Sequence, residues 1–279
     1  LAAWEAAERL PQLPASGGFA RLRREGTWLV EARYPYANTE TAPGHATLYT
    51  GVAPSRSGIY ANDILSDGRS VGIVADPTTH LVSDSGDNPT PPKTSVSLAR
   101  LRVPTLADQL RTAWPNARIV SLSLKDRGAL FGGGRQPTAS LWYDPIVDGM
   151  VTSPAVGREI PRWLRPVAGH QALVRARSKV WTPLDPKTIT QRSTTEDTQV
   201  GEGDYEGLGA TFPHVLSQAK NPSLAFRAGP WSDELLLNLA LAAVSAVRSP
   251  DQPMLLAVSL SAHDYVGHVF GPESWEAWD

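Results

Sequence analysis

The sequence predicts an α/β fold in which a mostly parallel central sheet is flanked by helices. A helical pattern that begins at residue 104 ends at Pro115–Asn116, and residues 117–124 then alternate as a strand does. A helix that leads into a strand through a tight turn is half of a βαβ unit, which implies parallel strands. A second helix, over residues 232–248, leads into residues 254–260. These are almost all apolar, as expected of a central parallel strand buried on both faces.

Composition and charge exclude several classes of protein. The 279 residues carry a formal net charge of −2 without a long basic run, so nothing favours a nucleic-acid partner or an anionic membrane surface. No apolar run approaches the roughly 20 residues that span a bilayer. Cysteine is absent, which excludes disulfides and thiolate metal sites and leaves His, Asp and Glu as candidate ligands.

The segment around Thr41 organises the chain. Residues 27–34 are rich in β-branched and aromatic side chains and short enough for a strand. Residues 41–51 then indicate a helix, with Pro43 in the first turn and Gly51 at the end. At such a strand-to-helix junction, free backbone N–H groups and the helix dipole attract an anion. Thr41 is therefore either a nucleophile beside a bound phosphate or a helix N-cap, and its position alone leaves both readings open.

Two charged pairs follow predicted strands, where open α/β sheets bind their ligands. Lys125 and Arg127 stand two residues apart in what we expect to be extended backbone, so both cations can converge on one phosphate dianion. Asp264 and His268 stand four residues apart and can share one side of a helical turn. Their polar atoms should then lie within about 5 Å of each other, as zinc ligands do. Spacing alone is also consistent with a solvated charged turn for the first pair and a capped loop for the second.

The remaining segments give weaker signals. Residues 1–10 indicate a short helix, and a second one opens at Gly17-Gly18 and stops at Gly26. Residues 54–68 are expected to be loop and turn, and residues 81–100, dense in Ser, Asp, Pro and Thr, to be an exposed loop. Residues 128–230 hold scattered glycines and prolines without sustained periodicity, which indicates an inserted cap region of irregular structure.

Three motifs resemble a single family. They are Thr-Ala-Pro-Gly-His at 41–45 with Leu-Tyr-Thr-Gly at 48–51 and the segment 54–63, then Ser-Leu-Lys-Asp-Arg-Gly-Ala at 123–129, and Ser-Ala-His-Asp-Tyr-Val-Gly-His at 261–268. The sequence resembles the alkaline phosphatase superfamily. Within it, the similarity is to the branch that holds the nucleotide pyrophosphatase/phosphodiesterases and the phosphate-irrepressible, single-threonine alkaline phosphatases.

The resemblance implies roles for the first two motifs. Thr41, two residues before the proline, would attack phosphorus, and Asn62 would hydrogen-bond a phosphoryl oxygen. Lys125 and Arg127 match the segment with which the single-threonine phosphatases contact the non-bridging oxygens of monoesters. The diesterase relatives generally lack this pair, so the resemblance favours a monoesterase.

The resemblance also implies two Zn²⁺ ions. Asp264 and His268 would bind one, and Thr41, when ionised, the other. Both chain ends look cut, and the family's other ligands should lie before Leu1 and after Asp279; a site that lacks half its ligands should bind zinc poorly. We assign no metal role to His45 and His263, which lie beside motif residues and for which packing or a hydrogen bond is the simpler interpretation. The isolated histidines are given no role: His80, His170 and His214.

The function expected from the resemblance is hydrolysis of small phosphate monoesters through a phosphothreonine at a two-zinc site. The alternatives are a phosphodiesterase or nucleotide pyrophosphatase on the same scaffold, and a catalytically incomplete fragment of such an enzyme. We expect residues 1–127 and 231–279 to form an alkaline phosphatase-like core and residues 128–230 to form an inserted cap or substrate region. The family resemblance implies a periplasmic or extracellular location, although the chain shows no signal peptide. The sequence leaves the oligomeric state open.

Overall fold

The computed structural model describes every residue except 1–9, 30, 84–93, 169, 194–195 and 199. The chain divides into two compact units, Leu1–Thr39 and Glu40–Asp279. No helix in the described part of the chain combines the length and the hydropathy needed to cross a bilayer.

The first unit holds a 3₁₀ turn, Leu10–Gln12, and helix α2, Gly18–Glu25, which was predicted and ends at Gly26. The helix predicted over residues 1–10 lies almost wholly outside the described residues. The strand predicted over residues 27–34 is wrong, because its described residues pair with no strand. A segment of strand-forming composition becomes a strand only where a neighbour accepts its backbone hydrogen bonds.

The second unit is built on a five-stranded sheet with the order β11-β6-β7-β8-β4. β6 runs parallel to β11 and to β7, whereas β8 is antiparallel to β7 and to β4. The predicted α/β fold is confirmed, with parallel pairing that extends into an antiparallel edge, so the sheet is mixed. The strands are β4 Val82–Ser83, β6 Arg118–Ser123, β7 Ala139–Asp144, β8 Gly149–Thr152 and β11 Met254–Ser259.

β11 lies at an edge of the sheet and not at its centre. Among the described strands it pairs only with β6, and of its six residues only Ala257 is fully buried. The prediction of a central strand buried on both faces is therefore wrong for this chain. Apolar composition reports how the two faces of a strand are covered, and it carries no information on the number of hydrogen-bonded neighbours.

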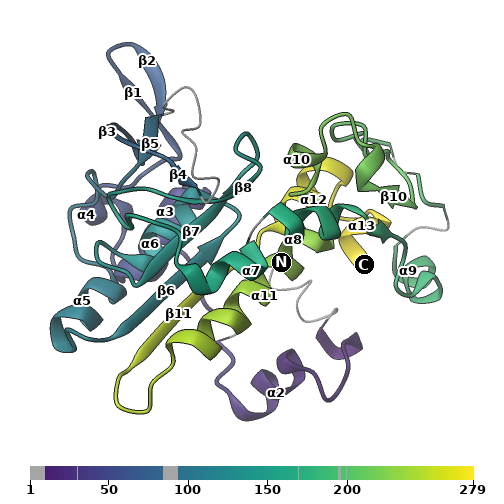
Figure 1. Ribbon diagram of the computed structural model, residues 1–279. Helices are drawn as coiled ribbons and strands as arrows, with labels where there is room; N and C mark the ends of the chain where they lie inside the picture. Colours follow the sequence, from purple (N-terminus) through teal and green to yellow (C-terminus); the bar gives the residue numbers. More distant parts are fainter. Residues whose placement is uncertain (1–9, 30, 84–93, 169, 194–195, 199) are drawn as a thin grey trace. The chain divides into compact units, whose positions relative to one another are not determined.

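Helices cover both faces of the sheet (Figure 1). α6, Asp126–Gly133, packs on one face, and α3, Thr41–Thr50, packs on α6. α11, Pro230–Val247, packs on the other face. Val120 and Leu122 of β6 join the apolar core on the α11 side, and both are fully buried.

α6 approaches the sheet closely through its glycines. A Cβ atom on Gly128 would lie 2.5 Å from Ser123 Oγ. A Cβ atom on Gly132 would lie 2.6 Å from Ser121 Oγ and 2.9 Å from the Cβ of Ala257. No side chain fits at these distances, so glycine lets the helix rest on the serine side of β6 and fixes the position of its N-terminus.

The predicted loop over residues 54–68 contains regular structure that the prediction missed. α4, Pro54–Ser57, precedes β1, Asp63–Ser66, which pairs with β2, Arg69–Gly72. The turn of this hairpin is Asp67–Gly68, with φ angles of 51° and 73°. An Asp-Gly pair between two strands favours a two-residue hairpin because both positions need positive φ. That signal was present in the sequence.

The exposed loop predicted over residues 81–100 is wrong at both of its described ends. β4 joins the main sheet, and β5, Thr94–Val96, pairs with β3, Ala75–His80. Ser95 and Leu98 are buried. The polar composition of this segment suggested solvent exposure, but short strands at its two ends pair with strands outside it.

Between β8 and α11, no described strand joins the main sheet. Because β7 and β8 belong to that sheet, the predicted inserted region fits a boundary after Thr152 better than one at residue 128. The three-part division of the chain stays a prediction. This stretch consists of η2 Arg162–Leu164, α7 Arg165–Ala168, α8 His170–Arg177, β9 Val180–Trp181, α9 Pro186–Arg192, β10 His214–Val215, η3 Leu216–Gln218 and α10 Pro222–Ala225.

Three further helices complete the fold. The helix predicted from residue 104 is α5, Leu106–Ala113, which starts with a capping box between Thr105 and Asp108. After β11 come α12, Ala262–Phe270, and α13, Trp275–Trp278. α12 carries the motif that holds the predicted metal ligands.

Candidate active site

Two helices of the candidate site begin where neighbouring parallel strands end. β6 and β11 are paired in register up to Ser123 and Ser259. α6 follows β6, with Lys125 as its N-cap, and α12 follows β11, beginning at Ala262. The two charged pairs predicted from the sequence therefore come to the same edge of the sheet, the one formed by the carboxyl ends of its parallel strands. Open α/β sheets bind their ligands there.

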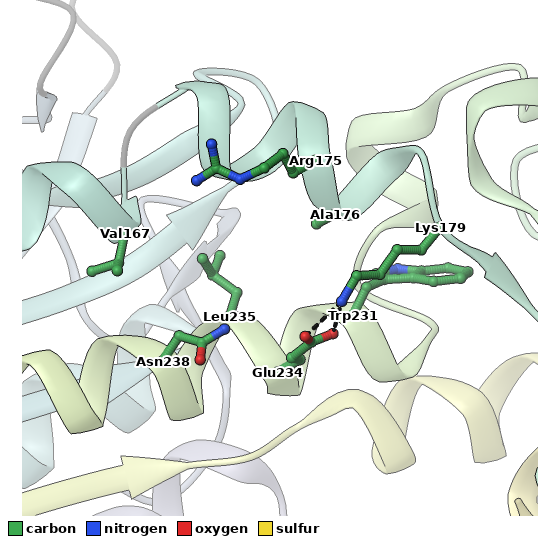
Figure 2. Close-up of a pocket in the computed structure, with 8 residues that line it drawn as sticks. All are labelled: Val167, Arg175, Ala176, Lys179, Trp231, Glu234, Leu235 and Asn238. Carbon is green, nitrogen blue, oxygen red and sulfur yellow. Dashed lines mark hydrogen bonds and ion pairs between the residues drawn. The ribbon is translucent and has the colours of Figure 1, made fainter.

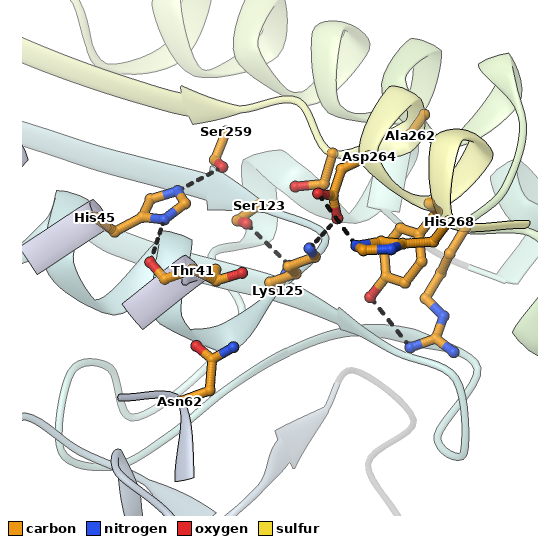
Figure 3. A network of polar contacts seen from close by, with 12 residues as sticks. Thr41, His45, Asn62, Ser123, Lys125, Ser259, Ala262, Asp264 and His268 are labelled. Carbon is orange, nitrogen blue, oxygen red and sulfur yellow. Dashed lines mark hydrogen bonds and ion pairs between the residues drawn. The ribbon is translucent and has the colours of Figure 1, made fainter. Parts of the chain in front are cut away.

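His45 ties α3 to this edge. Its Nε2 lies 2.9 Å from Ser259 Oγ, and its Nδ1 lies 2.9 Å from the carbonyl oxygen of Thr41 (Figure 3). A carbonyl oxygen only accepts, so Nδ1 carries the proton and Nε2 accepts from the serine hydroxyl. Burial lowers the pKa of His45, and the charges of Lys125 and Arg127 lower it further, which favours the neutral ring. The predicted hydrogen-bonding role of His45 is confirmed.

Thr41 is the first residue of α3. The N-cap position belongs to Glu40, so the reading of Thr41 as the cap is wrong. The start of this helix offers fewer free donors than the sequence suggests, because the N–H of Ala42 donates to Asn62 Oδ1 at 2.8 Å and Pro43 has no N–H. An anion beside Thr41 must therefore find most of its donors on side chains.

Asn62 is held in one orientation by two hydrogen bonds. Its Oδ1 accepts from the N–H of Ala42, and its own backbone N–H donates to Glu40 Oε2 at 2.6 Å. Since a backbone N–H can only donate, the amide oxygen must face Ala42, which leaves the Nδ2 group as a donor directed elsewhere. The sequence placed Asn62 in a loop, and it directly precedes strand β1.

Lys125 and Arg127 differ in backbone conformation. Lys125 is extended, with φ −118° and ψ 136°, but Arg127 lies in the first turn of α6, so the expectation that both lie in extended backbone is wrong. Both cations nevertheless lie near enough to His45 to lower its pKa. The Nε–H of Arg127 is buried, and it has no hydrogen-bond partner within the described part of the chain. A buried guanidinium donor without a partner is costly, and an anion would satisfy it.

Asp264 and His268 lie one turn apart on α12. Asp264 Oδ1 is 3.6 Å from His268 Nε2, which confirms the predicted proximity. The other carboxylate oxygen of Asp264 accepts from Lys125 Nζ at 2.5 Å (Figure 3). In the described ranges, no three or more His, Cys, Asp or Glu side chains are grouped to hold a metal ion. Asp264 and His268 supply two candidate ligands, whereas zinc usually takes four.

Sequence reasoning missed several residues that hold the site. Glu40 and Ser259 have no sequence signal beyond being polar next to a motif. Tyr265 lies inside the Asp264–His268 motif, whose four-residue spacing points only to the two predicted ligands at its ends. Arg227 contacts Tyr265 from the irregular region that precedes α11, where no periodicity could place it.

A separate pocket of about 270 Å³ lies between α8 and α11 (Figure 2). Trp231 lines it, together with Lys179 and Glu234, whose ion pair of 2.6 Å is about half exposed. Exposed pairs of this kind contribute little to stability. The eight residues that line the pocket include none of the predicted site residues, so the pocket is no part of the candidate active site.

Comparison with known proteins identifies the family. The family model for type I phosphodiesterase / nucleotide pyrophosphatase matches residues 3–279. The chain belongs to this family. Curated relatives include alkaline phosphatase PhoV of Synechococcus elongatus, 33% identical over 284 residues, and alkaline phosphatase PafA of Elizabethkingia meningoseptica, 30% identical over 288 residues. Each match covers 99% of this chain but only 50% and 51% of the relative, so the chain spans about half the length of the curated relatives it matches.

Solved structures support the same placement within the type I phosphodiesterase / nucleotide pyrophosphatase family. The crystal structure of wild-type alkaline phosphatase PafA matches with a TM-score of 0.85 and 30% identity, over 99% of this chain and 54% of that chain. A second matching structure is a PafA variant in which one threonine, one asparagine, one lysine and one arginine are substituted. The predicted resemblance to the alkaline phosphatase superfamily is confirmed.

Proposed function

We propose that the protein to which this chain belongs hydrolyses phosphate monoesters, with Thr41 as the nucleophile. The observation that carries the proposal is the meeting of Thr41, Asn62 and the Lys125/Arg127 pair at one edge of the sheet. One hydrogen bond, from the N–H of Ala42 to Asn62 Oδ1, links Asn62 to the start of α3, and both cations lower the pKa of His45 in the same helix. The relatives named alkaline phosphatases support the same reaction.

The four residues altered in the PafA variant support this choice of residues. That variant changes a threonine, an asparagine, a lysine and an arginine, in this order along the chain, with the last two separated by one residue. Thr41, Asn62, Lys125 and Arg127 follow the same order and have the same spacing at the end. We therefore assign to these four residues the contacts with the reacting phosphoryl group.

Each of the four has a separate task. Thr41 Oγ1 attacks phosphorus in line with the leaving oxygen, which departs as the alcohol and leaves a phosphothreonine; attack of water on phosphorus then frees phosphate and restores the hydroxyl. The Nδ2 group of Asn62 donates to one equatorial oxygen. Lys125 and Arg127 bind the others, where negative charge must be stabilised in the transition state. The partnerless Nε–H of Arg127 is a donor ready for that contact.

The proposal includes two Zn²⁺ ions, held in part by Thr41, Asp264 and His268. A carboxylate and an imidazole on one helical turn fit a zinc ion, but they make up only half of a four-ligand shell. When bound, the ions would supply positive charge that favours the Thr41 alkoxide and the leaving oxygen.

Two alternatives follow from specific observations. The family model covers phosphodiesterases, so a diesterase on the same scaffold is the first. The second is a chain that is incomplete as a catalyst, since its described residues supply only part of a metal site. Zinc content of the purified chain, measured by mass spectrometry, tests the second alternative: a stoichiometric amount of bound zinc would contradict it.

The test of the main proposal compares a monoester with a diester that has the same leaving group. Because a monoester brings two negative charges and a diester one, the Lys125/Arg127 pair should gain more from the monoester. Each lost charge-assisted hydrogen bond costs roughly 1.5–3 kcal/mol, so Lys125→Ala and Arg127→Ala should lower monoesterase kcat/KM about ten- to a hundredfold. Diesterase activity should stay nearly constant. Arg248→Ala, an exposed arginine at the end of α11, is the matched control.

The full-length, zinc-saturated protein is the material for this comparison. Equal losses on both substrates would mean that the pair supports the fold or the metal ions, and the monoesterase assignment would lose its basis. A wild-type protein that prefers the diester would favour the first alternative.

We also propose a periplasmic or extracellular location, which fractionation of the source cells tests. We propose in addition the three-part division of the chain, which limited proteolysis tests.

A further inference from the structure

The side chain of Lys125 lies in a cage that the sequence did not suggest. Its ammonium group contacts the Asp264 carboxylate at 2.5 Å and lies 4.8 Å from the centre of the Tyr265 ring. A cation at this distance from an aromatic face is attracted by the negative charge of the ring face. The side chain of Lys125 is only 13% exposed, so these contacts restrict a side chain that otherwise has many rotamers.

Tyr265 is itself fixed by an arginine from the irregular region before α11. Arg227 donates from Nη1 to the Tyr265 hydroxyl at 3.3 Å and from Nη2 to the Tyr205 hydroxyl at 2.6 Å. Its guanidinium carbon also lies 4.8 Å from the centre of the Tyr265 ring. The ring of Tyr265 therefore cannot turn without breaking contacts with Arg227, and Tyr205 holds Arg227 in turn.

The Asp264 carboxylate and the Tyr265 ring both hold the Lys125 ammonium group, and only Tyr265 has no further role in the proposed reaction. Asp264 is a predicted metal ligand, so its carboxylate charge is shared whenever a metal ion is bound. The ring of Tyr265 has no such second role in the proposed reaction. It is the contact that can keep the ammonium group in place in the working enzyme.

We infer that Tyr265, supported by Arg227, is a positioning residue that holds the Lys125 ammonium group for the phosphoryl oxygens of a monoester. The inference rests on the proposed function for its substrate class. Arg227 thereby connects the region before α11, through the Tyr265 ring, to the ammonium group of Lys125. The inference also assigns substrate preference in part to an aromatic ring that does not react.

The test measures binding of inorganic phosphate and turnover in the same set of proteins. The full-length, zinc-saturated protein is compared with Tyr265→Leu, which removes the ring, and Tyr265→Phe, which keeps the ring and removes the hydroxyl. Tyr49→Phe is the matched control, because Tyr49 is a half-buried tyrosine of α3 outside this contact chain. Lys125→Ala and the double variant Tyr265→Leu with Lys125→Ala complete the cycle.

We expect Tyr265→Leu to weaken phosphate binding and to lower monoesterase kcat/KM on the order of tenfold, with little change for a diester. Tyr265→Phe should lower monoesterase kcat/KM only about threefold, because the ring that attracts the ammonium group remains. In the Lys125→Ala background, Tyr265→Leu should have almost no further effect, since the group that it positions is already gone.

Additive losses in the double variant, or equal losses on monoester and diester, would overturn the inference, because a merely structural role moves both substrates alike. Unchanged phosphate affinity in Tyr265→Leu would overturn it as well. If Tyr265→Leu does not fold, Tyr265→Phe carries the test through its smaller selective loss. A wild-type protein without monoesterase activity would refute the proposed function, whereas the phosphate-binding cycle would still decide the role of Tyr265.

Discussion

Two substitutions of Asn62 can distinguish the role of its amide oxygen from the role of its amide nitrogen. Oδ1 accepts from the N–H of Ala42 at 2.8 Å, which leaves Nδ2 to donate to substrate. Asn62→Asp keeps the accepting oxygen and replaces the donor with a second carboxylate oxygen, whereas Asn62→Ala removes both. A hydrogen bond to a charged oxygen is worth roughly 1.5–3 kcal/mol, so Asn62→Ala should lower monoesterase kcat/KM about ten- to a hundredfold. Asn62→Asp should lower it further, because a negative charge then faces the phosphate.

The assay is the initial rate of aryl phosphate hydrolysis by the full-length, zinc-saturated protein. It is measured at a pH at which the introduced aspartate is ionised. Thermal unfolding of the same proteins supplies the control. Asn62→Ala should lose about 1 kcal/mol of stability because the N–H of Ala42 loses its partner, and Asn62→Asp should lose less. Near-normal turnover by Asn62→Asp would refute the reasoning, since Asn62 would then only hold α3 in place through its oxygen.

Three further predictions concern packing, pH and metal. Gly132→Ala should lower the free energy of unfolding by about 1–3 kcal/mol, because its Cβ would lie 2.6 Å from Ser121 Oγ. Gly44→Ala in α3, where nothing lies within 4 Å, should raise it by up to about 1 kcal/mol; urea unfolding of both variants checks the opposite signs, and two losses of equal size would contradict the packing argument. Burial raises the pKa of Asp233 above its ordinary 3.8, so the folded state holds that proton more tightly and the wild type loses stability as the pH rises through the raised pKa. Asp233→Asn should therefore be more stable than wild type at neutral pH, with the difference vanishing below pH 3.8 in thermal unfolding; a difference that grew on acidification would contradict this. Chelation should abolish monoesterase activity and added Zn²⁺ should restore it, and full activity of the metal-free protein would oppose the proposed chemistry.

Local signals were enough to predict much of the scaffold around the site. Pro43 and Gly51 predicted the first turn and the end of a helix, and they lie in the first turn of α3 and at its C-cap. The Asp-Gly pair at Asp67–Gly68 held enough information for a hairpin that was nonetheless missed. These features depend on backbone preferences of a few neighbouring residues, which is why a single sequence carries them.

Other features depend on partners far away in the chain. The composition of residues 27–34 favours a strand, but no described strand pairs with it. The apolar character of β11 gave no information on its place at an edge. The contact between Arg227 and Tyr265 joins two segments that no periodicity connects, so only the folded structure could reveal it.

For the site itself, similarity to the family's motifs predicted more of the residue roles than residue spacing did. Spacing alone left Lys125 and Arg127 consistent with a solvated turn, and the argument from extended backbone was wrong for Arg127. The proximity of Asp264 and His268 was predicted correctly, because residues four apart meet on a helix whatever surrounds it. Among the described residues, no third His, Cys, Asp or Glu is grouped with this pair to hold a metal ion.

Trapping of the covalent intermediate shows whether Thr41 is the nucleophile. The full-length, zinc-saturated protein would be mixed with an aryl phosphate, quenched in acid within one turnover and digested for mass spectrometry. We expect a phosphorylated peptide with the phosphate on Thr41. In Thr41→Ala we expect neither the phosphopeptide nor appreciable turnover. A phosphate on Thr39, or near-normal turnover by Thr41→Ala, would contradict the role of Thr41 as the nucleophile.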